Sequence, residues 1–408
     1  MNFLSTNNKS ECFGCEACVQ VCPKNAMNMK EDEEGFRYPS INSDLCVECG
    51  LCQKVCPANN MPDASKDDKY VFGGYHKDLA VRKISTSGGA FSAIAQAWAK
   101  QNDGDYLIFG AASDGLEVYH QGIDDIRNLP QICKSKYSQS KIGSCYAQVR
   151  DALKLGKKVL FSGTPCHVAG LKAFLRNADK SNLLLVEVIC EGVPSPLYIR
   201  KLDEHVSDKY GSRIKTLDYR SKGYKESARS FRWDFERMAL ELENGKILEK
   251  DRWFNPYWSI WLQHLMSRPS CYECPFTTKE RQADITLGDL WGVHIYCPEL
   301  YGNNGGASLV VCNTQKGREM WQNARTSFAG HELDFETALK YQGPMRKHID
   351  PNPERGECMR DLADPKMSYL DVCKKWAKKP TIKLLFQKYV WGNRQKVFVW
   401  NLRNKNHQ

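Results

Sequence analysis

Two runs of cysteines near the start of the chain have the spacing of iron–sulfur cluster ligands. Residues 12–23 read CFGCEACVQVCP and residues 46–57 read CVECGLCQKVCP, so both follow the pattern C-x2-C-x2-C-x3-C-P. In bacterial two-cluster ferredoxins, three closely spaced thiolates of such a run hold one cluster and the fourth cysteine ligates the other. Paired zinc knuckles are the alternative interpretation, but zinc sites do not require eight cysteines in two copies of this register. The pattern therefore predicts two 4Fe-4S clusters that together carry electrons.

The register of the runs also predicts which cysteines share a cluster. The first cluster is expected on Cys12, Cys15, Cys18 and Cys56, and the second on Cys46, Cys49, Cys52 and Cys22. Residues 26–41 separate the two runs and alternate apolar and polar side chains around an acidic turn that contains a glycine. This alternation predicts a β-hairpin. Residues 1–66 are thus expected to form a small ferredoxin-like domain of the α+β class.

The composition of the chain points to chemistry in a reducing compartment. The 408 residues include 18 cysteines, and the first residues, MNFLSTNNKSEC, lack the apolar core of a signal peptide. We therefore expect a cytoplasmic protein, in which so many thiols indicate metal or redox chemistry rather than disulfides. No apolar run approaches the roughly 20 residues of a membrane-spanning helix.

The net positive charge of the chain is concentrated in its C-terminal part. The formal net charge is +10, and residues 366–408 alone hold eleven Lys and Arg residues against one acidic residue. We expect the basic tail, residues 351–408, to be helical and to pack the apolar side of its segment TIKLLFQKYVWGNRQKVFVWNL on the body. Peripheral contact with the anionic inner face of a membrane is the alternative. No zinc-finger, helix-turn-helix or RNA-recognition pattern accompanies the charge, so no nucleic-acid partner is expected.

The region between these two parts has the pattern of a mixed α/β domain. After a polar linker at residues 58–70, apolar strands are predicted within 70–77, 105–113, 182–190, 283–293 and 307–317. A helix is predicted within residues 85–102, and a helix–strand–helix run over residues 148–177. Strands that alternate with helices predict one α/β domain over residues 67–350. The G-x-G-x-x-G fingerprint of dinucleotide-binding folds is absent from the sequence.

Two turns in this domain are candidate anion or cofactor sites. Ser85, Thr86, Ser87, Gly88 and Gly89 stand directly before a predicted helix. Backbone N–H groups at a helix start, with hydroxyls beside them, form a cradle for phosphate. An ordinary helix cap is the alternative for this stretch. The second turn, with Gly163 and Thr164, joins the apolar strand before it to the helix that begins at Pro165.

Four further cysteines lie at turns, loops or strand ends of the predicted domain. Cys166 stands in the first turn of a helix, where the positive helix end is expected to lower its pKa. Cys190 ends an apolar strand, where ligand sites gather in open α/β sheets. Cys271 and Cys274 form a C-x-x-C pair in a loop. A zinc clip or a redox dithiol is the alternative for that pair, and a buried structural thiol the alternative for Cys166.

Five stretches of the sequence together resemble one known protein family. They are STSGGAFSAIA, KKVLFSGTPCHVAGLKAFL, CEGVPSP, CYECPF and ADITLGDLWG. The family they resemble is the coenzyme F-420 hydrogenase/dehydrogenase beta-subunit family. The resemblance implies an iron–sulfur flavoprotein with one FAD and a third 4Fe-4S cluster. It implies that Cys166, Cys190, Cys271 and Cys274 hold this cluster, and that the turns at Ser85–Gly89 and Gly163–Thr164 bind the flavin. Many members of the family have Gln at the position of His167, so the resemblance assigns no role to this histidine.

The resemblance leads to a functional hypothesis. We expect an oxidoreductase that takes electrons from ferredoxin, reduced deazaflavin or another low-potential donor and passes them through 4Fe-4S clusters and FAD to a substrate. The family implies a small molecule or a glycan precursor as substrate, in surface polysaccharide biosynthesis. The alternative is an electron-transfer subunit that feeds a separate catalytic partner and has no substrate of its own.

Overall fold

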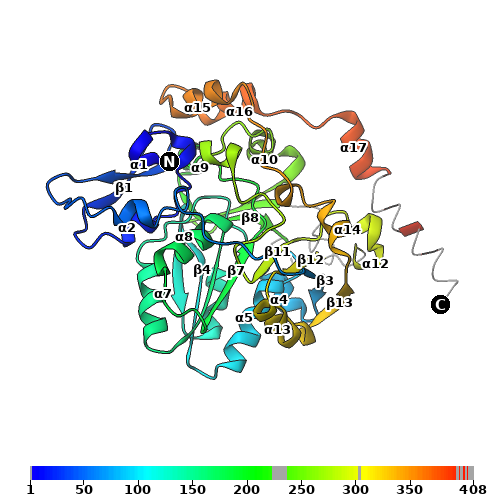
Figure 1. Cartoon of the computed structure of the whole chain (residues 1–408). Helices are drawn as coiled ribbons and strands as arrows, with labels where there is room; N and C mark the ends of the chain where they lie inside the picture. The colour runs from blue at the N-terminus through cyan, green and yellow to red at the C-terminus, as the bar shows by residue number, and fades with distance from the viewer. Residues whose placement is uncertain are drawn as a thin grey trace.

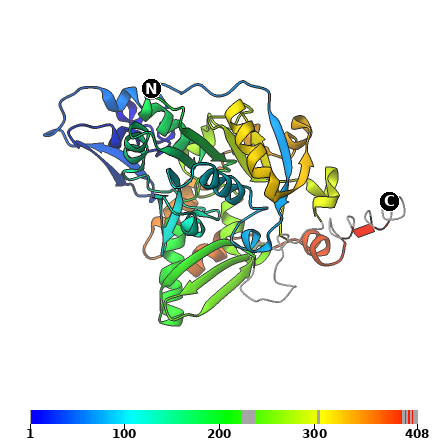
Figure 2. The ribbon, with the colours of Figure 1, turned by 90° about the horizontal axis from the view of Figure 1, so that it is seen from below.

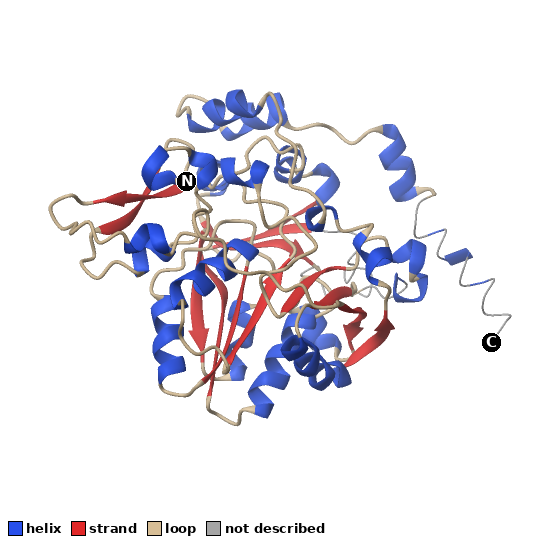
Figure 3. Cartoon of the chain, in the orientation of Figure 1, coloured by secondary structure: helices blue, strands red, loops and turns tan. Residues whose placement is uncertain are grey.

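A computed structural model describes residues 2–222, 237–301 and 305–391, together with residues 395, 398, 399 and 402. Much of the end of the predicted basic tail, Trp400 included, lies outside the described residues. The N-terminal cysteine-rich module lies at one side of a larger body in which strands are enclosed by helices (Figures 1 and 3). Among the described residues, no helix combines the length and the apolar character needed to cross a membrane.

The strands form three sheets. The thirteen described strands are β1 (Met27–Glu31), β2 (Arg37–Ile41), β3 (Tyr70–His76), β4 (Tyr106–Asp114), β5 (Glu117–Ile123), β6 (Lys158–Gly163), β7 (Leu183–Val188), β8 (Ile214–Ser221), β9 (Arg237–Leu242), β10 (Ile247–Asp251), β11 (Ile285–Asp289), β12 (Ser308–Cys312) and β13 (Phe328–Glu332). The first two strands pair antiparallel as the predicted hairpin. Strands β8, β9 and β10 make a small antiparallel sheet, which projects from the body in Figure 2.

The helices are mostly short. Those described are α1 (Phe3–Thr6), α2 (Ala17–Gln20), α3 (Leu51–Lys54), α4 (Leu79–Lys83), α5 (Ala90–Gln101), α6 (Leu129–Ile132), α7 (Cys145–Lys154), α8 (Pro165–Leu175), α9 (Leu197–Tyr210), α10 (Pro256–Trp261), α11 (Val293–Tyr296), α12 (Pro298–Tyr301), α13 (Gln315–Ala324), α14 (Phe335–Leu339), α15 (Arg355–Ala363), α16 (Tyr369–Trp376) and α17 (Ile382–Tyr389). The helix predicted after the STSGG stretch is α5, and the predicted helix–strand–helix run is α7, β6 and α8.

The main sheet has eight strands in the order β13-β3-β12-β11-β7-β6-β4-β5. Its central strands β4, β6, β7 and β11 run parallel, and each strand outside them pairs antiparallel with its neighbours. Side chains of β6 alternate between two cores: Val159 and Phe161 pack with α7 and α8, and Leu160 packs with α5. Apolar burial on both faces is the usual state of a parallel sheet. The predicted fold class, a ferredoxin-like module followed by a mixed α/β domain and a helical tail, is confirmed.

The predicted C-terminal tail divides into two parts. Helices α15 and α16 bury Cys358, Met359 and Trp376 in a core that they share with α9, α10 and the small sheet. The apolar side of α17 is not packed in this way, because Ile382 is 86 % exposed and Phe386 is 52 % exposed. The packing expected for this last segment is therefore wrong for α17, which extends away from the body in Figure 1.

Candidate metal and cofactor site

Four of the predicted cluster ligands surround one small cavity in the N-terminal module. Cys12, Cys15, Cys18 and Cys56 all line a cavity of about 30 Å³, which we call the first cysteine cavity. Burial, reinforced by the neighbouring thiols, raises the pKa of Cys15 and Cys18 well above the usual range of a thiol. Four sulfur ligands around one cavity fit a 4Fe-4S cluster. This grouping is the one that the register of the two runs predicts.

The second predicted set lies nearer to solvent. Burial raises the pKa of Cys52, and the nearby Cys46 and Cys49 add to this rise. Cys49 is exposed, whereas the fourth predicted ligand, Cys22, is half-buried and accepts a hydrogen bond of 3.3 Å from the Ala26 N–H to its sulfur. Hydrogen bonds to sulfur are among the features that tune cluster potentials. The assignment of Cys22 to this set stays a prediction.

The four later cysteines come together at the carboxyl end of the parallel strands. Cys166, Cys190, Cys271 and Cys274 all line a cavity of about 50 Å³, which we call the second cysteine cavity. Cys166 follows β6 and Cys190 follows the adjacent strand β7. Cys271 lies in the 3-10 helix Pro269–Glu273, and Cys274 is the residue that ends this helix. Segments more than 100 residues apart in the chain thus supply one set of sulfur atoms.

Backbone pairing explains why Cys190 and Cys271 meet. The N–H of Arg268 donates to the carbonyl of Val193 at 2.8 Å, and the N–H of Ser195 donates to the carbonyl of Met266 at 2.7 Å. These bonds place the loop after β7 alongside the segment that precedes Cys271. A Cβ at Gly192, where φ is +101°, would lie 3.4 Å from the Cβ of Cys271, so glycine suits this close approach.

A buried ion pair fixes the loop that carries Cys274. The Arg281 guanidinium pairs with Glu187 of β7, and both side chains are almost completely buried. The same guanidinium donates to the carbonyl of Phe276 at 2.8 Å. The carboxylate of Glu187 also accepts a hydrogen bond of 2.9 Å from the Thr286 hydroxyl. A buried pair with further hydrogen bonds holds its segments in one arrangement, and here these segments include the loop after Cys274.

The thiol pKa values at the second cysteine cavity are set by burial. Burial raises the pKa of Cys271 to about 11 and that of Cys274 to about 12, and it raises the pKa of Cys166 as well. The expectation that the helix end lowers the pKa of Cys166 is therefore wrong in direction. The Thr164 hydroxyl, 3.1 Å from the Cys166 sulfur, opposes the rise without overcoming it.

Arg268 lies between the two cysteine cavities and is 1 % exposed. Its guanidinium donates to the carbonyl of Cys12 at 2.9 Å, the side-chain oxygen of Gln139 at 2.9 Å and the carbonyl of Arg37 at 3.0 Å. All three acceptors are neutral, so these hydrogen bonds satisfy the guanidinium without balancing its charge. Burial raises the pKa of Cys12 and of Cys271, and the Arg268 charge opposes the rise at both. No local sequence pattern points to this residue, because its role depends on tertiary contacts.

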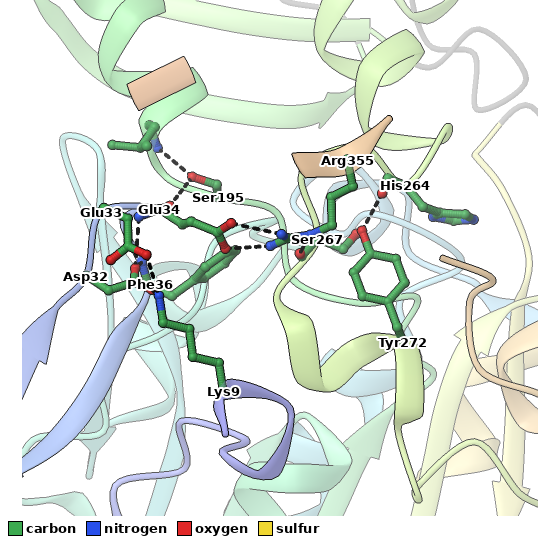
Figure 4. Close-up of polar contacts among 11 residues, drawn as sticks. Lys9, Asp32, Glu33, Glu34, Phe36, Ser195, His264, Ser267, Tyr272 and Arg355 are labelled. Carbon is green, nitrogen blue, oxygen red and sulfur yellow. Dashed lines mark hydrogen bonds and ion pairs between the residues drawn. The ribbon is translucent and has the colours of Figure 1, made fainter. Parts of the chain in front are cut away.

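The N-terminal module is docked on the body through the turn of its hairpin, as Figure 4 shows. Arg355 of α15 makes a two-bond ion pair with Glu34, at 2.8 and 2.6 Å, and donates to the carbonyl of Ser267 at 3.0 Å. The Ser195 hydroxyl donates to the carbonyl of Glu34 at 2.6 Å. Because these partners belong to the segments that form the second cysteine cavity, the docking places that cavity beside the module. Phe13 lines both cysteine cavities.

A larger pocket of about 330 Å³ lies on the other side of the second cysteine cavity. We call it the central pocket. The loop from Cys190 to Val193 lines both the second cysteine cavity and the central pocket. Its other walls include the aromatic side chains Tyr137, Trp258 and Trp291. A pocket with aromatic walls and a few polar groups is typical of a cofactor or substrate site.

The predicted cofactor residues meet at this pocket with one exception. Ser85, Thr86, Ser87, Gly89, Gly163 and Thr164 line the central pocket. Gly88 does not, and a Cβ at this position would lie 2.5 Å from the carbonyl oxygen of Gly74, so its small size serves strand packing. The hydroxyls of Ser85 and Ser87 already donate to main-chain carbonyls at 2.7 Å. These two hydroxyls are therefore not free to donate to a phosphate, which would need hydrogen bonds and positive charge from other groups of the pocket.

Three pocket residues that sequence reasoning did not assign have the chemistry of ligand-binding groups. Both ring nitrogens of His167 are buried and lack a hydrogen-bond partner among the described residues. Burial lowers the pKa of His120 to about 4, and its ring nitrogens lie 2.7 Å from the Ser140 hydroxyl and 3.0 Å from the Ser162 carbonyl. Burial also lowers the pKa of Lys136 to about 8, and its ammonium donates to the carbonyl of Cys133 at 2.7 Å. Of the three residues, only His167 has buried polar atoms without partners among the described residues, and such atoms usually mark a place where a ligand or water belongs.

Two models of known protein families match separate parts of the chain. A family model described as a 4Fe-4S dicluster domain matches residues 11–60. A second, which describes the C terminus of the beta subunit of coenzyme F420 hydrogenase/dehydrogenase, matches residues 156–333. The first match confirms the predicted pair of 4Fe-4S clusters, and the chain is an electron-transfer iron–sulfur protein. A search among curated proteins finds no match to it.

One similar solved structure is a chain of the F420-reducing [NiFe] hydrogenase complex from Methanosarcina barkeri, described in a xenon-derivatised form. The sequences are 16 % identical, and the alignment covers 77 % of this chain and 94 % of that chain with a TM-score of 0.42.

Proposed function

Since the chain belongs to the coenzyme F420 hydrogenase/dehydrogenase beta-subunit family, we propose that it is an iron–sulfur flavoprotein that moves electrons from its dicluster module to a substrate at the central pocket. The observation that carries this proposal is that each of the three spaces shares a wall with the next. Phe13 separates the two cysteine cavities, and the loop from Cys190 to Val193 separates the second cavity from the central pocket. Redox groups in the first cysteine cavity, the second cysteine cavity and the central pocket would therefore be neighbours in that order.

The second cysteine cavity suits a third 4Fe-4S cluster better than a zinc ion. Four sulfur ligands satisfy either group. Either group is an anion when four thiolates hold it, so either would balance the buried charge of Arg268. The cluster is preferred because the cavity lies between the dicluster module and the central pocket, where zinc, which has no redox chemistry, could not carry electrons. Cys166, Cys190, Cys271 and Cys274 are the ligands in this proposal.

The central pocket suits FAD, which would couple one-electron transfer to two-electron chemistry. Lys136 supplies positive charge for the diphosphate, and the backbone at the start of α5 supplies N–H groups beside it. His167 offers two ring nitrogens, which have no partner within the described part of the chain, to the polar atoms of the flavin or of the substrate. His120 is neutral at pH 7 because of its low pKa, so it contributes a hydrogen bond and no charge.

The lysine makes the expected binding of FAD dependent on pH. The pKa of Lys136 is about 8, so its ammonium is present at pH 7 and is lost as the pH rises. Only the ammonium pairs with a diphosphate, and the affinity for FAD should therefore fall about tenfold between pH 7 and pH 9. Flavin fluorescence titration of the apoprotein at several pH values measures this change.

The matched variants for this prediction are Lys136→Arg and Lys136→Met. The arginine variant keeps its charge at both pH values, so its FAD affinity should be independent of pH over this range. The methionine variant should bind FAD weakly at both. An affinity that falls equally in the wild type and in Lys136→Arg would remove the lysine from the proposed site.

The proposed reaction is the reduction of an unsaturated or oxidised small molecule, and precursors of surface glycans are the first class to assay. Ferredoxin or another low-potential protein is the proposed donor. The second candidate function is that of an electron-transfer subunit for a separate catalytic partner. The central pocket, with a volume of about 330 Å³, favours the enzyme, because a subunit without a substrate of its own would need an exposed flavin surface rather than a pocket.

The experiment that tests the proposal is the anaerobic reduction of flavin bound to the full chain by a reduced ferredoxin. We expect the flavin absorbance to bleach in the wild-type protein. A flavin that binds but is not reduced by any low-potential protein donor would contradict the proposed direction of electron flow. Oxidation of the reduced flavin by an added substrate, but not by buffer, would then distinguish the enzyme from the subunit.

A further inference from the structure

A third group of potential metal ligands lies apart from both cysteine cavities. The Cys297 sulfur is 3.1 Å from the Glu299 carboxylate oxygen Oε1 and 3.1 Å from the His331 ring nitrogen Nε2. The Glu299 oxygen and the His331 nitrogen are themselves 3.3 Å apart. One sulfur, one nitrogen and one oxygen atom therefore form a nearly equilateral triangle.

This triangle has the size that a tetrahedral metal ion requires. With Zn–S near 2.3 Å and Zn–N and Zn–O near 2.0–2.2 Å, tetrahedral zinc holds its donor atoms roughly 3.4–3.6 Å apart. The three observed separations need to grow by only a few tenths of an ångström to admit the ion. We propose that Cys297, Glu299 and His331 bind a zinc ion that is separate from the iron–sulfur chemistry.

The burial of the three ligands indicates a site with one open coordination position. Cys297 is fully buried, whereas the side chains of Glu299 and His331 are 48 % and 49 % exposed. The thiolate would thus bind from the protein side and leave the opposite side of the ion to water. A mixed sulfur, nitrogen and oxygen set suits zinc, which accepts all three donor types.

The position of the site suggests what the zinc would hold together. Cys297 follows α11 and Glu299 belongs to α12, whereas His331 belongs to the edge strand β13. The ion would therefore fasten the segment after β11 to the edge of the main sheet. That segment also contributes Trp291 to the wall of the central pocket. Zinc would stabilise this wall without taking part in electron transfer, since it has no redox chemistry of its own.

The alternative is a hydrogen-bonded group of three side chains without an ion, and zinc binding by the full-length protein separates the two. Anaerobically purified protein is dialysed against zinc chloride, and the bound zinc and iron are counted by mass spectrometry. We expect about one zinc per chain, with one sulfur and the remaining ligands nitrogen or oxygen in the X-ray absorption spectrum. The variants His331→Ala and Cys297→Ser should each weaken zinc binding at least tenfold while the iron content stays unchanged.

One control variant and the exposure of His331 keep this test decisive. Cys312→Ser alters another buried cysteine, in β12, and should keep the zinc. His331→Ala changes a half-exposed side chain, so its result does not depend on whether a core variant folds. Zinc that binds equally to the wild type and to His331→Ala, or that has only sulfur neighbours, would overturn the proposal, because the ion would then occupy the iron–sulfur cysteines.

Discussion

Replacing Cys271 with alanine should remove about four of the roughly twelve iron atoms that three 4Fe-4S clusters contain. Cys271 lines the second cysteine cavity and not the first, so its loss should leave both clusters of the N-terminal module in place. Iron analysis of the anaerobically purified protein gives the count. Electron paramagnetic resonance of the reduced sample shows whether the two remaining clusters keep their signals.

The control for this variant is Cys358→Ala, because Cys358 is also a buried thiol but lies in the core formed by α15, α16 and the small sheet. We expect it to lose stability without losing iron. An iron content near eight in the wild-type protein, unchanged by Cys271→Ala, would show that the second cysteine cavity holds no cluster. Zinc in place of the missing iron would identify the cavity as a zinc site instead.

The second large effect is expected at Arg268, where methionine should make the potentials of the neighbouring clusters more negative. A unit charge about 7 Å away at an effective dielectric constant of about 20 contributes roughly 2.4 kcal/mol, which corresponds to a shift on the order of 100 mV for one electron. Loss of the positive charge disfavours the reduced, more negative state of a cluster. Redox titration monitored by electron paramagnetic resonance measures the change.

The matched variant Arg268→Lys separates charge from positioning. Lysine keeps the positive charge but cannot reproduce the planar set of hydrogen bonds to Cys12, Gln139 and Arg37. We therefore expect potentials close to those of the wild type in Arg268→Lys, with a lower thermal stability. Equal potentials in the wild type and in Arg268→Met, in samples with full iron content, would contradict the electrostatic role of this residue.

The parts of the site that could be predicted from the sequence are those with a local pattern. The spacing of Cys12, Cys15 and Cys18 is set by cluster geometry, so it is visible in a dozen residues. The turn at Gly163 and the strand end at Cys190 follow apolar strands, and parallel strands bring their carboxyl ends to one edge of a sheet. For this reason the four later cysteines could be grouped from the sequence and the family resemblance alone.

The remaining features depend on burial and on contacts between distant segments. The pKa of Cys166 rises because the side chain is buried, and a helix-end argument from the sequence has no access to that burial. Nothing in the sequence distinguishes Arg268 from a surface arginine, and only the fold shows that it is buried. Lys136 and His167 likewise become candidate ligand-binding groups only because the fold places both on the wall of the central pocket. The exposed apolar side of α17 is a further example, since an amphipathic pattern does not reveal what covers it.

The central claim is that the second cysteine cavity connects the dicluster module to a flavin in the central pocket. Rapid mixing of FAD-loaded protein with reduced ferredoxin, in the wild type and in Cys271→Ala, tests it most directly. The account predicts that the wild-type flavin is reduced and that reduction is lost or strongly slowed in Cys271→Ala, although this variant keeps its FAD and its two N-terminal clusters. Flavin reduction at the same rate in both proteins would contradict the account.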